Sequence, residues 1–300
     1  MVAVAIICAL LGAVSLAVGS FLQGSTINET HGDAGVSIAG IFSMFKQPRW
    51  VAGLVFMGLG MLLNLTALRY APLMIVQPLG SLAVVITTLI NTKAIGGRLN
   101  QKAMMGILAC VFGSVAFVIG AMHITNEQTI TREQEEFTMR IMLVVFCIVA
   151  FMMTFLKKWA PPFSYVLSAG ILFGFVSVLT RITLTQFFDS NGKGWANVNF
   201  IALAALVICS LFGSWVVQNA YSKQPPDMVS AGLTVIDPIV GVSIGIVLLG
   251  EAKSPVNIPI SLGMVVAAGI AISGVVTLSK FHPGREVAAS KAQQAQIHNV

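Results

Sequence analysis

Charged side chains are scarce in this sequence. They make up 9% of its 300 residues, while hydrophobic residues make up 56%, whereas an ordinary soluble domain has about 25% charged residues. This scarcity excludes a soluble globular protein and indicates an integral membrane protein. It is not a β-barrel, because the apolar runs are continuous and about twice as long as a tilted spanning strand requires.

Cysteine and histidine are also rare, and neither is arranged for chemistry. The four cysteines lie inside apolar runs without CxxC spacing, so we interpret them as small apolar residues and expect neither a disulfide nor a metal site. The four histidines fall at or beyond the ends of the runs, and no Gly-x-Ser-x-Gly, His-Glu-x-x-His or P-loop motif occurs. We therefore predict that the protein is not an enzyme and needs no cofactor.

The apolar runs predict an all-α membrane protein with about nine transmembrane helices. Each run is long enough to cross a bilayer as a helix. The expected spans cover approximately residues 1–22, 50–68, 72–91, 103–122, 138–156, 164–188, 199–221, 228–250 and 258–278.

The positions of the basic residues predict the orientation of the chain. Basic residues gather at 93–102, at 157–158 and in the tail at 280–291, which fall on one side of the membrane if there are nine spans. The acidic loop at 127–136 falls on the other side. Because cytoplasmic loops carry an excess of Lys and Arg, we expect the C-terminus in the cytoplasm and the N-terminus outside, in the plasma or inner membrane. The net charge of +6 serves this orientation, so no nucleic-acid partner is expected.

Two prolines interrupt apolar runs, and each follows a polar residue. Asp237 precedes Pro238, and Gln77 precedes Pro78. Proline removes a backbone donor and leaves the carbonyl four residues earlier without its partner, and a carboxylate inside a span is costly and usually functional. We predict helix kinks at both prolines and a substrate or coupling site formed by Asp237 and Gln77.

A stretch of about 55 residues contains motifs specific enough to suggest a family. They are Pro48-Arg-Trp50-Val-Ala-Gly53, Gly58-Leu-Gly60-Met-Leu-Leu-Asn64, Tyr70-Ala-Pro-Leu-Met-Ile-Val-Gln77-Pro-Leu-Gly80 and Arg98-Leu-Asn100. This stretch resembles the NIPA-like branch of the drug/metabolite transporter superfamily, which also contains the EamA-like transporters. The resemblance implies a membrane transporter, and the NIPA-like branch is associated with magnesium.

Two departures from the family pattern count against magnesium. The pattern has glutamates where this chain has Met61 and Gly97, and a hard divalent cation prefers carboxylate ligands. By contrast, Gly250-Glu251 at the end of the eighth span is similar to the Gly-Glu that closes the corresponding helix in the wider superfamily. The wider assignment is therefore the safer one.

The last four spans are interpreted as a second copy of the first four. The first repeat covers residues 1–122, the fifth span with its flanks links the copies at 123–163, the second repeat covers 164–279, and a cytoplasmic tail covers 280–300. Five helices separate equivalent elements, so the copies cross the membrane in opposite directions. Such an inverted repeat places the substrate site near the membrane midplane.

Four further residues within the spans are candidates for the site. Arg181 could reach outward to the membrane surface, pair with Asp237 or receive an anionic substrate group. Asn64 and Asn219 could form interhelical hydrogen bonds or contact the substrate, and Trp215 could line a cavity or pack against lipid or a helix.

These observations predict a secondary transporter that moves a small metabolite or drug-like solute by alternating access. Burial disfavours the ionised form of a carboxylate, so Asp237 could exchange a proton or a cation near neutral pH and couple transport to it. One alternative is a magnesium or other divalent-cation transporter, and another is a non-transporting membrane scaffold or lipid-handling protein. The expected partners are a small-molecule or ion substrate and the lipid bilayer, and the sequence leaves a homodimer open.

Overall fold

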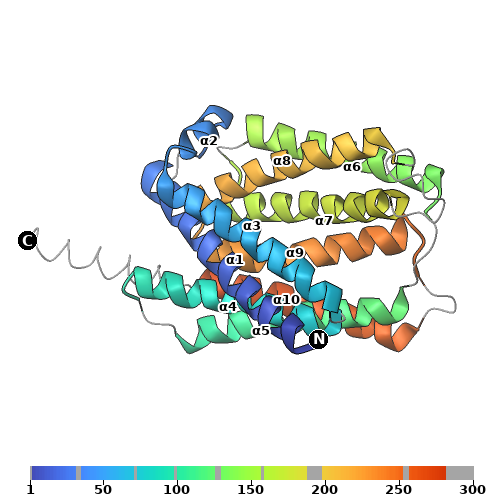
Figure 1. The fold of residues 1–300 in the computed structure, drawn as a ribbon, viewed down its shortest axis with the longest axis horizontal. Helices are drawn as coiled ribbons and strands as arrows, with labels where there is room; N and C mark the ends of the chain where they lie inside the picture. The colour runs from blue at the N-terminus through green and yellow to red at the C-terminus, as the bar shows by residue number, and fades with distance from the viewer. Residues whose placement is uncertain are drawn as a thin grey trace, which may run out of the picture.

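The structure is a computed structural model that describes residues 2–31, 35–70, 73–97, 100–125, 130–156, 159–187, 198–252 and 257–281. Within these residues it contains ten α-helices and no strand (Figure 1), which confirms the predicted all-α class. The helices are α1 (Val2–His31), α2 (Ile38–Met44), α3 (Pro48–Tyr70), α4 (Leu73–Ala94), α5 (Gln101–Ile124), α6 (Arg132–Phe155), α7 (Pro162–Phe187), α8 (Phe200–Lys223), α9 (Pro226–Val247) and α10 (Ile258–Lys280).

Nine of these helices correspond to the nine predicted spans. Eight of them are long and apolar enough to cross a membrane, and α4 adds a shorter apolar stretch, Leu79–Ala94. The remaining helix, α2, has seven residues and joins α1 to α3. The chain is therefore an integral membrane protein.

The first helix is longer than predicted. We expect it to end near residue 22 and a loop to follow, but α1 continues to His31. The hydroxyls of Thr26 and Thr30 donate hydrogen bonds of 2.7 Å to the carbonyls of Leu22 and Thr26, so these polar side chains are satisfied without ending the helix. The polar residues after position 22 are typical of a loop, so composition alone predicts an end of the helix that is too early.

The helices of the two halves have similar neighbours. In the first half α1 packs against α3 and α4, and in the second half α7 packs against α8 and α9. Helices α4 and α9 contact each other, and α5 pairs with α10, from Gly106 beside Leu278 to Gly120 beside Met264. Figure 1 shows α9 between α7 and the α5–α10 pair. Helix α9 therefore contacts both halves of the chain.

The two prolines lie inside helices, as the sequence predicts. Pro238 is inside α9, and Pro78 is inside α4, although its side chain and that of Gln77 lie outside the described residues. Both helices continue beyond their proline. The predicted kinks remain a prediction.

Candidate functional site

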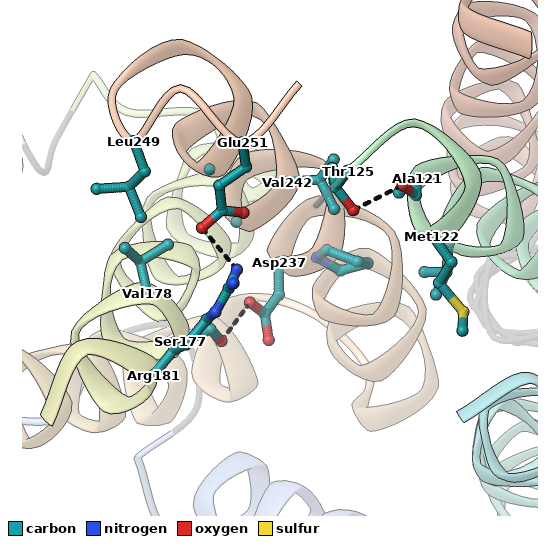
Figure 2. A pocket seen from close by; sticks show the side chains of 14 residues that line it. Ala121, Met122, Thr125, Ser177, Val178, Arg181, Asp237, Val242, Leu249 and Glu251 are labelled. Atoms are coloured by element: carbon teal, nitrogen blue, oxygen red, sulfur yellow. Dashed lines mark hydrogen bonds and ion pairs between the residues drawn. The ribbon is translucent and has the colours of Figure 1, made fainter. Parts of the chain in front are cut away.

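A pocket of about 460 Å³ lies between α5, α7 and α9. Much of its lining is apolar, from residues such as Val118 and Val178. Its polar lining comes from α7, from α9 and from the segments that follow α5 and α9 (Figure 2): Thr125, Ser177, Arg181, Asp237 and Glu251.

Asp237 lies near the middle of α9 and is half-buried. Ser177 on α7 donates a hydrogen bond of 3.1 Å to its Oδ1. The two helices approach closely here because Gly174 has no side chain; a Cβ at this position would lie 2.6 Å from Cγ1 of Val240 and 3.1 Å from the backbone nitrogen of Gly241. The glycine on α7 therefore allows the hydroxyl to reach the carboxylate.

Arg181 lies one turn beyond Ser177 on α7 and forms an ion pair with Glu251. Its Nη1 donates to Glu251 Oε1 at 2.6 Å, and the Glu251 side chain is 5% exposed. A hydrogen bond between two charged groups at this distance is among the stronger polar contacts in proteins. Figure 2 shows Arg181 reaching past Ser177 toward Glu251. The structure therefore pairs Arg181 with Glu251, whereas one of the interpretations of the sequence paired it with Asp237.

The segment after α9 holds Glu251 in place. Gly250 adopts a positive φ of 67°, which glycine tolerates without strain. Gln134 on α6 donates through Nε2 to the Leu249 carbonyl at 3.0 Å, and the Glu251 amide donates to the Gly245 carbonyl at 3.1 Å. Sequence reasoning treated Glu251 as the end of a helix and missed its place in the pocket.

The oxygen atoms of this pocket suit a hard cation. Two carboxylates and the Ser177 hydroxyl line it, and Mg²⁺ is commonly bound through one or two carboxylates while it keeps several waters. No group of three or more His, Cys, Asp or Glu side chains that could hold a metal ion occurs in the described part of the chain. The pocket is therefore suited to a partly hydrated ion and lacks the ligands of a closed structural metal site.

Trp215 and Asn219 lie away from this pocket and hold the segment that leads into α2. Asn219 accepts from the Val36 amide at 2.9 Å and donates to the Val36 carbonyl at 3.0 Å. The indole Nε1 of Trp215 donates to the same carbonyl at 2.8 Å. These contacts give Asn219 a structural role, although its partner Val36 lies in the segment before α2 and not in a helix as the interhelical interpretation assumed.

The two remaining candidates are Asn64, which is not among the residues that line the pocket, and Gln77. The backbone of Asn64 on α3 lies next to Gly12 on α1, and the side-chain Oδ1 of Asn64 is buried without a hydrogen-bond partner among the described residues. The side chain of Gln77 is outside the described part, although its backbone belongs to α4. Of the six predicted site residues, the pocket brings together Asp237 and Arg181.

A second group of polar residues joins the two halves at the opposite end of the helices, and apart from Gln218, a candidate for interhelical hydrogen bonding, sequence reasoning missed it. Ser20 on α1 hydrogen-bonds the Tyr221 hydroxyl at 2.8 Å and the Ser230 hydroxyl at 2.6 Å. Gln218 on α8 donates to Gln23 on α1 at 3.0 Å. We call these five residues the closed end. Their spacing of three residues, from 20 to 23 and from 218 to 221, was the available signal, because it places each pair on one helix face.

A further hydrogen bond joins α4 to α9 near the closed end. Asn91 Nδ2 donates to Asp227 Oδ1 at 2.8 Å, and the Asp227 side chain is fully buried. Asn91 is near the end of α4 and Asp227 is in the first turn of α9. This contact therefore also links the two halves of the chain.

Comparison with known proteins identifies similarity over the first part of the chain. The model of the family described as Magnesium transporter NIPA matches residues 1–185. Ser177 and Arg181 lie within the matched residues, and both pocket carboxylates lie beyond them. No solved structure matches the chain.

Individual relatives match shorter segments. Magnesium transporter NIPA4 of Mus musculus is 32% identical over 99 residues, which are 33% of this chain and 24% of that protein. Probable magnesium transporter NIPA6 of Arabidopsis thaliana is 34% identical over 90 residues, which are 30% of this chain and 26% of that protein. Probable magnesium transporter NIPA2 of Arabidopsis thaliana is 33% identical over 118 residues, which are 37% of this chain and 35% of that protein. The chain thus spans about a quarter to a third of the length of these curated relatives.

Proposed function

The chain belongs to the magnesium transporter NIPA family of the drug/metabolite transporter superfamily, and from this premise we propose that it carries a divalent cation such as Mg²⁺ across a membrane. The family is one of transporters, which agrees with the expectation that the protein is not an enzyme. The metabolite carrier predicted from the sequence becomes the second candidate.

The pocket carboxylates are the observation on which this proposal rests. Asp237 and Glu251 both line the pocket, and Ser177 adds a hydroxyl oxygen beside Asp237. The two glutamates of the family pattern are absent from this chain, but Met61 is 62% exposed on α3 and is not part of the pocket lining. The presence of methionine instead of the family's glutamate at this position therefore removes no ligand from this pocket.

Alternating access is the mechanism we propose. The matching neighbours of α1 and α7 support an inverted repeat of residues 1–122 and 164–279. The pocket extends toward the ends of α5 and α9, while hydrogen bonds join the halves at the closed end. With the N-terminus outside, as the loop charges predict, the pocket would face the exterior and the closed end the cytoplasm.

A second candidate is the proton-coupled metabolite carrier. Arg181 favours it, because a guanidinium in the pocket suits an anionic group on a substrate and repels a free cation. Asp237 would then carry the coupling proton. This carrier would use the same pocket and the same alternating-access mechanism.

The decisive test is cation uptake by the reconstituted chain. Proteoliposomes enclosing a Mg²⁺-sensitive dye should take up Mg²⁺ faster than protein-free liposomes. Asp237→Asn should lower the uptake rate by about tenfold or more, because it removes a full charge from a partly screened site. The control is Glu29→Gln, which removes an exposed acid paired with Arg49 away from the pocket, and it should leave uptake unchanged.

The possible failures have different meanings. Wild-type rates in Asp237→Asn would show that the cation path avoids this pocket. Absence of uptake by the wild-type chain would reject magnesium transport. Substrate-dependent proton movement that is lost in Asp237→Asn would then support the metabolite carrier.

A further inference from the structure

The ion pair in the pocket differs from the other salt bridges of the described chain. Arg49–Glu29 and Arg140–Glu136 have both side chains at least half exposed. In the Arg181–Glu251 pair the acid is 5% exposed, whereas the arginine is 40% exposed. Surface pairs of the first kind contribute little, but a buried carboxylate needs a partner.

The pair lies between Asp237 and the ends of α7 and α9. Asp237 is ten residues before Val247, the last residue of α9, which is about 15 Å along the helix axis. Glu251 follows that end, and Arg181 is one turn beyond Ser177, the residue that binds Asp237. A cation that enters from this end meets Arg181 and Glu251 before it reaches Asp237.

The two partners differ in how firmly they are held. Glu251 is fixed by its backbone bond to Gly245, by Gln134 through Leu249, and by the backbone bridge between Thr125 and Ala252. Arg181 reaches the pair on a long side chain with several rotatable bonds. If the pair opens, the guanidinium therefore moves and the carboxylate stays.

We propose that Arg181 is a tethered cation that neutralises Glu251 while the pocket is empty, and that an entering cation must displace it. The proposal rests on the cation transport proposed above and assigns Arg181 the control of admission to that site. With the pair closed, Asp237 is the available carboxylate. With it open, Asp237 and Glu251 both become available, which favours divalent over monovalent ions.

Thiol labelling tests this proposal without requiring transport. Ser177→Cys places a thiol beside Asp237, in a background in which Cys8 and Cys147 are replaced by alanine. Cys110 and Cys209 are buried and stay. The chain is reconstituted in liposomes and labelled with a cationic methanethiosulfonate carrying a trimethylammonium group, or with uncharged methyl methanethiosulfonate.

Arg181→Gln should raise the rate for the cationic reagent on the order of tenfold relative to the neutral reagent, because it removes a unit charge from the entry path. In the double variant Arg181→Gln/Glu251→Gln most of this increase in relative labelling rate should be lost, because the carboxylate that would attract the cation is then absent. Arg140→Gln, which breaks an exposed pair on α6, is the matched control and should leave the ratio unchanged.

The proposal would be overturned if the ratio of cationic to neutral labelling rates were the same in wild type and Arg181→Gln. It would also be overturned if Arg181→Gln raised this ratio equally in the presence of Glu251 and in the Glu251→Gln background. A general loosening of the fold would raise both labelling rates together, and this outcome also overturns it. If wild-type liposomes carry no Mg²⁺ but the ratio changes as expected, the proposed cargo is wrong and the role of Arg181 stands.

Discussion

Asn219 shows how one amide side chain can hold two elements together. It satisfies both backbone polar groups of Val36 and also donates to the Trp215 carbonyl. Val36 and Asn219 are buried, and a buried polar group without a partner costs about 1–3 kcal/mol. The position of α2 against α8 therefore depends on this residue.

Asn219→Ala should lower the stability of the protein by about 1–3 kcal/mol, because it leaves the Val36 amide without its side-chain acceptor. Thermal unfolding in detergent measures this change. Thr66→Ala is the control, because Thr66 is exposed and bonds within its own helix. The Mg²⁺ concentration for half-maximal uptake should not change. Lost uptake with unchanged stability would instead support a substrate role for Asn219.

Single residues differ in how well the sequence reveals their role. Asp237 could be predicted to line a pocket between helices, because a carboxylate inside an apolar run is costly unless it has a partner or a task. Its neighbour on α7, Ser177, could not be predicted, since helices contain many serines. The pairing of Arg181 with Glu251 spans 70 residues, and it depends on the turn at Gly250, which hydropathy does not describe.

The close contact between α5 and α10 is the clearest feature at the level of elements. A Cβ added at Gly113 would lie 2.6 Å from the Ala271 nitrogen and 2.8 Å from the Ala267 carbonyl oxygen. Both are backbone atoms, which cannot move without shifting the helix. Close approach at small residues is a common way for helices to associate in membranes.

Gly113→Ala should therefore force α5 and α10 apart and cost about 1–3 kcal/mol by overpacking. Gly269→Ala on α10 is the matched control, because a Cβ there meets nothing within 4 Å. The control should be neutral or slightly stabilising, since alanine is favoured over glycine in helices. Unfolding midpoints and the monodisperse fraction in detergent compare the two variants. Equal stability would mean that α10 can shift at little cost.

The existence of the helices was easier to predict than their ends. Long apolar runs identify spans because the bilayer core requires about 20 apolar residues. The end of α1 was missed because Gln23 and Thr26 are polar but buried, so they behave as interior residues of the protein. Polar contacts between helices can only be recognised when the partner helix is known.

At the level of the whole molecule, the pocket and the closed end lie at opposite ends of the bundle. The pocket is lined by α5, α7 and α9, whereas Ser20, Tyr221 and Ser230 join α1 to α8 and α9. An alternating-access transporter must break the contacts at one end when it closes the other. Each hydrogen bond between membrane helices contributes only about 0.6 kcal/mol on average, so this group can open without unfolding the protein.

The double variant Ser20→Cys/Ser230→Cys tests whether the closed end must open. The two hydroxyl oxygens lie 2.6 Å apart, and cysteines at these positions should form a disulfide on oxidation if the backbone separation suits one. Mass spectrometry of the oxidised protein measures the fraction cross-linked. With Cys8 and Cys147 replaced by alanine, oxidation should stop Mg²⁺ uptake and reduction should restore it, while each single variant should transport under both conditions. Full uptake by a completely cross-linked population would show that the cation crosses without separation of α1 and α9, and alternating access about this end would be wrong.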